Sequence, residues 1–246
     1  MRAVDALEVL ELLGSTQRGL VTTAQARESG LSGVDLTRLT DSGKLHRVRH
    51  GVYALPSAGA DRLQDLRGAW LAASANGDVV VSGASAAVVH GLGDLVPAAH
   101  EFTAPVRRQS TLPDLRFHRA ELSDDDLTVV DGLPVTTVVR TAADLAASLL
   151  DSDHLAGVLS AAVENLDVDV EELAQALSPY ARRYGFDSGR ALLAEAAPGY
   201  VAAALSSAVR TAVTHSPRFR KQALKLLAEP DGAKTLLSFL EERLAS

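Results

Sequence analysis

The sequence predicts a mostly helical α+β protein built in three parts, and three observations support this fold class. The first sixty residues have the pattern of three short helices followed by a hairpin. The segment 61–148 mixes strand-like alternation with short helices, and from Asp151 the pattern is helical to the end. We therefore expect a domain at 1–58, a mixed α+β domain at 61–148, and a helical region at 149–246 that continues the second domain.

Apolar spacing predicts the first two helices. Apolar side chains recur along one helix face at Ala3, Leu7, Leu10 and Leu13. Gly14 follows as the expected C-terminal stop. A second helix, barely two turns long, is predicted between a threonine N-cap, Thr22 or Thr23, and Gly30. Both helices would turn one face toward a common core.

A third helix and a hairpin complete the N-terminal pattern. Ser32 is predicted to cap the helix, whose buried face carries Leu36 and Leu39. The segment 44–55 alternates as two strands that pivot near Gly51. Helix, short helix, serine-capped helix and β-wing, in that order, are the parts of a winged helix-turn-helix.

The charge distribution favours DNA binding through this part of the chain. The net charge is −7, yet the stretch from Arg38 to His50 holds four Lys and Arg residues against Asp41 alone. A basic hairpin could simply be solvated, but its concentration in an acidic chain favours a local positive field. The predicted contacts to phosphates and base edges are Arg38, Lys44, His46, Arg47, Arg49 and His50. Asp35 could accept from a cytosine amino group, but a helix-capping role is favoured.

The middle segment predicts a mixed sheet with short helices. A buried strand, DVVVSG, precedes a helix rich in small residues that Ser82 or Ser85 can cap. HEFTAP and LRFHRA are strand-like, and Asp131-Gly132 is a strong hairpin turn signal. A helix capped by Thr136 or Thr137 follows. The acidic run at 123–126 is predicted to be a solvated turn.

The sequence does not predict catalysis. Ser85, His90 and Asp94 lie close together in sequence, but the second glycine of a nucleophile elbow is missing, and a triad is normally assembled from separate elements. His90 is predicted to be a packed histidine bonded to a nearby carbonyl. Trp70, among aliphatic neighbours, is predicted to lie in the core.

Cofactor and metal sites are not predicted either. The histidines lack the spacing of zinc ligands, and both nucleotide-binding glycine motifs are missing. The chain has no cysteine, no apolar stretch long enough to span a membrane, and acids inside its apolar start. We expect a cytoplasmic protein without a membrane partner.

A second basic stripe lies near the C-terminus. Arg218, Lys221 and Lys225 recur at i, i+3 and i+7, and no acid follows until Glu229. A solvated helix face is the simpler interpretation. The alternative is a contact with a polyanion or an acidic protein partner.

The chain resembles the AbiEi-type antitoxins of bacterial toxin-antitoxin systems. The resemblance covers roughly residues 5–165 and rests on VTTAQARESGL, GKLHRVRHGVYALP, VVVSGASAAVVHGLGD, HEFTAP and DGLPVTTVVRTAADLAA. It implies a winged helix that represses its own operon and a C-terminal domain that counteracts a cognate nucleotidyltransferase-like toxin. By this resemblance Arg38, Lys44, Arg47 and Arg49 would contact the operator, which is double-stranded DNA.

Two related classes of protein fit less well. Residues 166–246 lack the acidic strand and histidine of the very-short-patch-repair-like nucleases that are fused to similar N-terminal halves. Gly14-Ser15 is not followed by the D-x-D of the toxin itself. The favoured interpretation is a non-enzymatic antitoxin and autorepressor. The alternative is a stand-alone winged-helix transcriptional regulator with a helical partner-binding domain.

Overall fold

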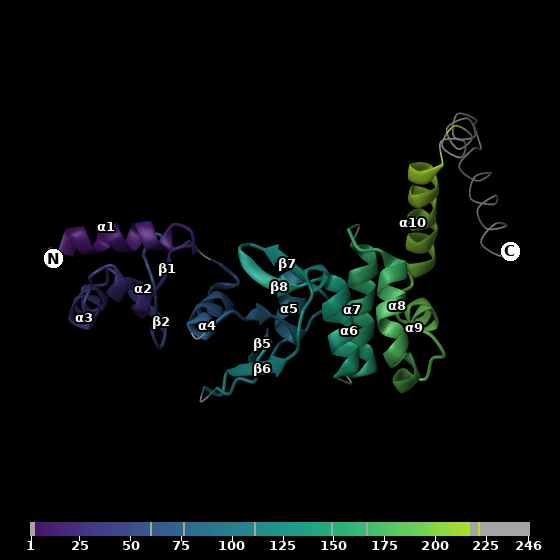
Figure 1. Cartoon of the computed structure of the whole chain (residues 1–246), viewed down its shortest axis with the longest axis horizontal. Coiled ribbons are helices and arrows are strands. Elements are labelled where there is room, and N and C mark those ends of the chain that lie inside the picture. Colours follow the sequence, from purple (N-terminus) through teal and green to yellow (C-terminus); the bar gives the residue numbers. More distant parts are fainter. Residues whose placement is uncertain are drawn as a thin grey trace. The chain divides into compact units, whose positions relative to one another are not determined.

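The computed structural model of the chain describes residues 3–59, 61–75, 77–110, 112–148, 150–165, 167–216 and 221. The chain divides into two units. The first contains 1–91 and 95–141, and the second contains 92–94 together with the chain from 142 onward. The predicted α+β class is confirmed, and Figure 1 shows the order of its elements. The domain boundaries at 58 and 149 stay predictions.

The N-terminal part has the topology of a winged helix. Its elements in chain order are α1 (Ala3–Gly14), β1 (Leu20–Thr22), α2 (Thr23–Glu28), α3 (Gly33–Asp41), β2 (His46–Arg49) and β3 (Val52–Ala54). The three strands form an antiparallel sheet in the order β1-β3-β2. Strand β1 was not predicted, because three residues are too few to show alternation. The helices and the wing hairpin occur where the sequence predicts them.

The small sheet is buried on both faces because its side chains alternate. Val21 and Tyr53 face the core formed with the leucines of α1 and α3. Leu20, Val52 and Ala54 face the opposite way and pack against Leu71. Leu71 belongs to α4 (Gln64–Ser74), a helix beyond the wing that the sequence pattern did not reveal. One helix of the mixed region therefore completes the core of the winged helix.

The mixed region is built on a five-stranded sheet. The elements that follow α4 are β4 (Val80–Val81), α5 (Gly83–His90), β5 (His100–Ala104), β6 (Leu115–Arg119), a 3-10 turn (Asp124–Asp126), β7 (Leu127–Val130), β8 (Leu133–Thr136) and α6 (Val138–Ala147). The strand order is β6-β5-β4-β8-β7, with parallel pairs β5–β6 and β4–β8. Phe102, Val81 and Val135 lie at the centre of its core.

The hairpin signal and the threonine cap of this region are confirmed. Ser82 occupies the N-cap position of α5 but makes no capping hydrogen bond with its side chain, and Ser85 lies inside the helix. Asp131 and Gly132 have φ values of 53° and 79°, which suits the two-residue turn between β7 and β8. Thr137 accepts a hydrogen bond from the Arg140 N–H at the start of α6. The acidic run forms a 3-10 turn in which Ser123 and Asp126 bond each other reciprocally. Asp126 also pairs with Arg140 at 3.4 Å.

The second unit is helical in its described part. Its helices are α7 (Ser152–Glu164), α8 (Val170–Ala181), a 3-10 turn (Arg182–Tyr184), α9 (Gly189–Ala196) and α10 (Tyr200–His215). Asp151, Asp169 and Ser188 cap three of them with side-chain hydrogen bonds. A Cβ at Gly189 would lie 1.9 Å from the Ala174 carbonyl oxygen, so only glycine lets α9 approach α8 so closely. In the described residues we find no helix with both the length and the apolar character of a membrane span.

His90 is a packed histidine, as predicted. It lies half-buried at the end of α5, and its Nε2 is 2.7 Å from the Thr136 carbonyl oxygen. Burial lowers the pKa of His90, and this effect exceeds the opposing effect of the hydrogen bond to Thr136. The folded protein therefore favours the neutral imidazole.

This shift predicts a pH dependence of stability. Because the pKa is lower in the folded than in the unfolded state, the contribution of His90 is present above the unfolded value of 6.5 and is lost as the pH falls below it. We expect wild type to lose more stability than His90→Gln between about pH 7.5 and pH 5.5. Urea unfolding followed by Trp70 fluorescence measures both proteins. Equal losses would show that His90 does not contribute.

Candidate nucleic-acid interface

The third helix begins at a reciprocal cap. Ser32 Oγ accepts from the Asp35 N–H at 3.2 Å, and Asp35 Oδ2 accepts from the Ser32 N–H at 2.9 Å. The hydrogen bond from the Ser32 hydroxyl, followed by that from its N–H, lowers the pKa of Asp35. Asp35 is thus engaged in capping, as predicted. Thr22 and Gln25 form the same arrangement at α2.

The exposed face of α3 carries a mixed set of side chains. With Leu36 and Leu39 buried, the opposite face presents Val34, Thr37 and Arg38. The Arg38 side chain is 66% exposed, and its nearest carboxylate oxygen, on Asp35, is 4.0 Å away. Val34 and Thr37 were not predicted as site residues, although helical spacing from the buried leucines would have found them. An exposed valine could contact a thymine methyl group.

The wing presents most of the predicted contact residues to solvent. Exposed side chains there are those of Lys44, His46, Arg47 and His50. Arg47 Nη2 lies 3.0 Å from His50 Nδ1, so the tip of the wing is held by a local contact. Arg38 on α3 is exposed as well, so both elements present basic side chains to solvent. Their role in DNA binding stays a prediction.

Arg49 differs from this expectation. Strict alternation would put Arg47 and Arg49 on one face of β2, but the pairing with β3 shifts register between them. The bulge turns Arg49 toward α4, where its side chain is 10% exposed and forms an ion pair with Asp114. Its Nη1 is buried and has no hydrogen-bond partner among the described residues. In this conformation Arg49 is not a surface cation.

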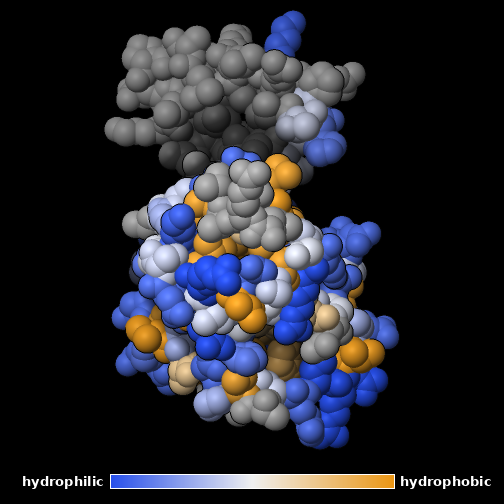
Figure 2. Space-filling view, turned by 90° about the vertical axis from the view of Figure 1, so that its left-hand side faces the viewer, coloured by the Kyte–Doolittle hydropathy of each residue, from blue (hydrophilic) through white to orange (hydrophobic). Residues whose placement is uncertain are grey.

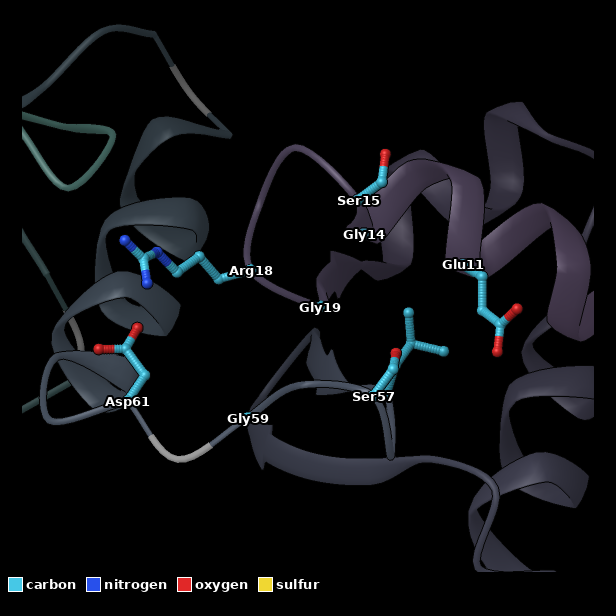
Figure 3. Close-up of a pocket in the computed structure, with 9 residues that line it drawn as sticks. Glu11, Gly14, Ser15, Arg18, Gly19, Ser57, Gly59 and Asp61 are labelled. Carbon is cyan, nitrogen blue, oxygen red and sulfur yellow. The ribbon is translucent and has the colours of Figure 1, made fainter.

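A pocket of about 480 Å³ lies between the end of α1 and the segment that leads from the wing to α4. It is lined by Glu11, Gly14, Ser15, Arg18, Gly19, Leu55, Ser57, Gly59 and Asp61. Figure 3 shows Arg18 and Asp61 on one side of it, with Glu11 on the other. Arg18 bonds Asp131 at 3.0 Å, so its charge is already paired.

Buried Arg67 ties the region beside this pocket together. Its Nε donates to Asp61 at 3.1 Å, and its Nη1 donates to the Asp131 carbonyl at 2.9 Å. Burial opposes ionisation of Asp61, but the hydrogen bonds from the Leu63 N–H and Arg67 outweigh it and lower the Asp61 pKa. These contacts join α4, the segment before it and the β7–β8 turn into one polar cluster, which has the character of a structural junction.

The surface at the winged-helix end is predominantly polar. Figure 2 views the molecule from this end, and hydrophobic residues appear there in small groups separated by hydrophilic ones. Such a surface suits a charged, hydrated partner better than an apolar one.

The remaining sequence candidates have structural partners. Ser85 Oγ accepts from the Glu101 N–H at 2.9 Å, and His90 bonds Thr136, so the two side chains are engaged separately. Trp70 packs between two apolar clusters and donates its indole N–H to the Val79 carbonyl at 3.1 Å. Over the described part of the chain, no group of three or more acidic or histidine side chains could hold a metal ion.

The C-terminal basic stripe falls largely on residues that the structure does not describe. Lys221 is helical and exposed. Arg218 and Lys225 lie outside the described residues. The role of the stripe stays a prediction from the sequence.

Comparison with known families gives two matches. A family model described as "Transcriptional regulator, AbiEi antitoxin" matches residues 8–56. A model of the "AbiEi antitoxin C-terminal domain" matches residues 79–194. The matches together cover about two thirds of the chain and run past residue 165, through α8 and almost to the end of α9.

Individual proteins give weaker matches. No curated protein matches the chain. Among solved structures, the crystal structure of the RV2827C protein from Mycobacterium tuberculosis has 22% sequence identity and a TM-score of 0.48, with 80% of each chain covered.

The cap of α3 gives a testable prediction for this surface. Ser32→Ala should lower the free energy of unfolding by about 1 kcal/mol, because an N-cap oxygen is removed. Ser32→Thr keeps that oxygen and should cost less. Urea unfolding compares the three proteins. An unchanged midpoint in Ser32→Ala would show that α3 does not need this cap.

Proposed function

Because the chain belongs to the AbiEi family of antitoxins and DNA-binding transcriptional regulators, we propose that it represses its own operon and counteracts a cognate nucleotidyltransferase-like toxin. In this proposal the winged helix binds operator DNA and the rest of the chain opposes the toxin. Both activities take place in the bacterial cytoplasm.

The observation that carries the DNA-binding half is the exposed cationic surface of α3 and the wing. Arg38 projects from the solvent face of α3, where a helix in the major groove meets base edges. Lys44 and Arg47 are exposed on the segment that follows α3 and suit phosphate contacts. Such a surface on a chain with a net charge of −7 provides a local attraction for a polyanion.

The antitoxin half is supported by the second family match. Residues 79–194 correspond to an AbiEi C-terminal domain. The candidate catalytic side chains of this segment, Ser85 and His90, are engaged by separate backbone partners. We propose that the segment acts by binding. Beyond this segment, the basic stripe that contains Lys221 offers the first candidates for a contact with the toxin, which would act on association rate and depend on salt.

A second candidate function is a stand-alone winged-helix regulator whose helical part binds another partner. The surface of α3 and the wing supports this alternative equally well. A nucleotidyltransferase gene beside the gene for this chain would favour the antitoxin, and rescue from that toxin decides between the two.

The DNA contacts make a prediction about specificity. Arg38→Ala should weaken binding to the upstream region of the chain's own gene by about 1 to 3 kcal/mol, and binding to random duplex much less, because a bidentate arginine reads guanine. Lys44→Ala/Arg47→Ala should weaken binding to both duplexes. It should also lower the salt slope by about one unit for each phosphate that is no longer neutralised. Arg182→Ala, an exposed arginine of the second unit, is the matched control.

Fluorescence anisotropy at several salt concentrations measures these affinities. Equal losses on both duplexes would make Arg38 a phosphate contact. Unchanged binding by the Lys44/Arg47 variant would exclude the wing from the interface.

The proposed assignment of DNA binding to the winged helix and of toxin neutralisation to the rest of the chain can be tested in cells. Lys44→Ala/Arg47→Ala should still rescue growth from the neighbouring toxin, since the toxin-opposing part is intact. Charge reversal at Lys221 and Lys225 should weaken rescue. The measurement is growth with both proteins expressed from an unrelated promoter, at equal antitoxin abundance. Full rescue by the charge-reversal variant would show that the stripe is only a solvated helix face. Failure of the wing variant to rescue growth would show that toxin neutralisation needs the N-terminal part.

A further inference from the structure

Arg49 is a wing cation that the fold turns inward. The register shift after Arg47 rotates Arg49 toward α4, where the stem of its side chain passes over Gly68. A Cβ at Gly68 would lie 3.6 Å from Arg49 Cδ, which is ordinary contact distance. The guanidinium then reaches Asp114, in the turn before β6.

The two ends of this guanidinium have different environments. Nη2 bonds Asp114, whose side chain is 46% exposed, so the paired end lies at the edge of the solvent. Nη1 is buried and lacks a hydrogen-bond partner among the described residues. A buried donor without an acceptor destabilises the conformation that contains it. The inward position is therefore maintained by one ion pair and opposed by one unsatisfied donor.

We propose that Asp114 occupies Arg49 in place of a DNA phosphate, and that Arg49 becomes a phosphate contact when this ion pair opens. A carboxylate and a phosphate offer a guanidinium the same kind of charged oxygen acceptor, and arginine binds both in a forked geometry. This inference rests on the proposed DNA binding. It assigns to Asp114 a positioning role that restrains one cation of the interface.

The location of the pair favours exchange with DNA over any other ligand. Arg49 lies two residues from the exposed Arg47 on the same strand but on the opposite face, so it reaches a phosphate held at the wing only when its side chain leaves Asp114. Moving Arg49 outward would also release Nη1 from its buried position. Because Asp114 is half-exposed, opening the pair leaves its carboxylate in contact with water.

The exchange predicts that removing the carboxylate strengthens DNA binding. In the full chain, Asp114→Asn should raise affinity for a duplex of the chain's own upstream region by about threefold or more, the effect of one partly exposed ion pair. The slope of log affinity against log salt should steepen by about one unit, because one further phosphate is neutralised. Asp125→Asn removes an exposed acid elsewhere in the first unit and is the charge-matched control.

A double variant and a nitrogen-15 NMR measurement distinguish the predicted gain in affinity from an effect on folding. Arg49→Gln/Asp114→Asn should lose the gain, since the released cation is then missing. In wild type, the side-chain Nε–H signal of Arg49, assigned with Arg49→Gln, should shift in nitrogen-15 spectra when the duplex is added.

Three results would overturn the proposal. In the first, Asp114→Asn binds the duplex with wild-type affinity and salt slope, while Lys44→Ala/Arg47→Ala binds it more weakly. This result would show that Arg49 forms only the ion pair with Asp114. In the second, the gain persists in the double variant or equals that of Asp125→Asn, so that it comes from general charge. In the third, neither wild type nor any variant binds duplex DNA, which removes the proposed function itself.

Discussion

The structure of the first unit depends on one constraint: a three-stranded sheet of very short strands must be covered on both faces. Leu20, Val52 and Ala54 are at most 4% exposed, yet they point away from the helices of the winged helix itself. Burial of Leu20 and of Val52 contributes about 1.5 to 3 kcal/mol each. Helix α4 provides the cover, and the polar contacts of Arg67 and Arg49 then form at the edges of that packed surface.

The same packing decides which cations reach solvent. Val48 faces α4 by alternation, and the bulge turns Arg49 to the same side, which removes one charge from the surface. Arg47 stays exposed to solvent on the wing. The wing therefore exposes less positive charge than its composition suggests. The cause is the irregular geometry of strand β2.

Local signals in the sequence predicted local features of the fold. Ser32, Thr22 and Asp131-Gly132 each act through neighbours within three residues, and each occurs where it was expected. Helix α4 and the partner of Arg49 were not predictable in the same way. Both depend on contacts between segments far apart in sequence, such as the 65 residues that separate Arg49 from Asp114. The alternation of side chains along β2 could not predict the bulge either. An extra residue breaks the two-residue period on which that prediction depends.

Helix α4 lies between the two family matches, which end at residue 56 and begin at residue 79. It nevertheless contributes Leu71 to the core of the winged helix and Ala69 to that of the mixed sheet. A genetic exchange that joined this winged helix to a foreign C-terminal half at residue 57 would leave Leu20 and Val52 facing water. The packed core of this winged helix therefore extends as far as α4, and a breakpoint after Ser74 keeps Leu20 and Val52 covered by Leu71.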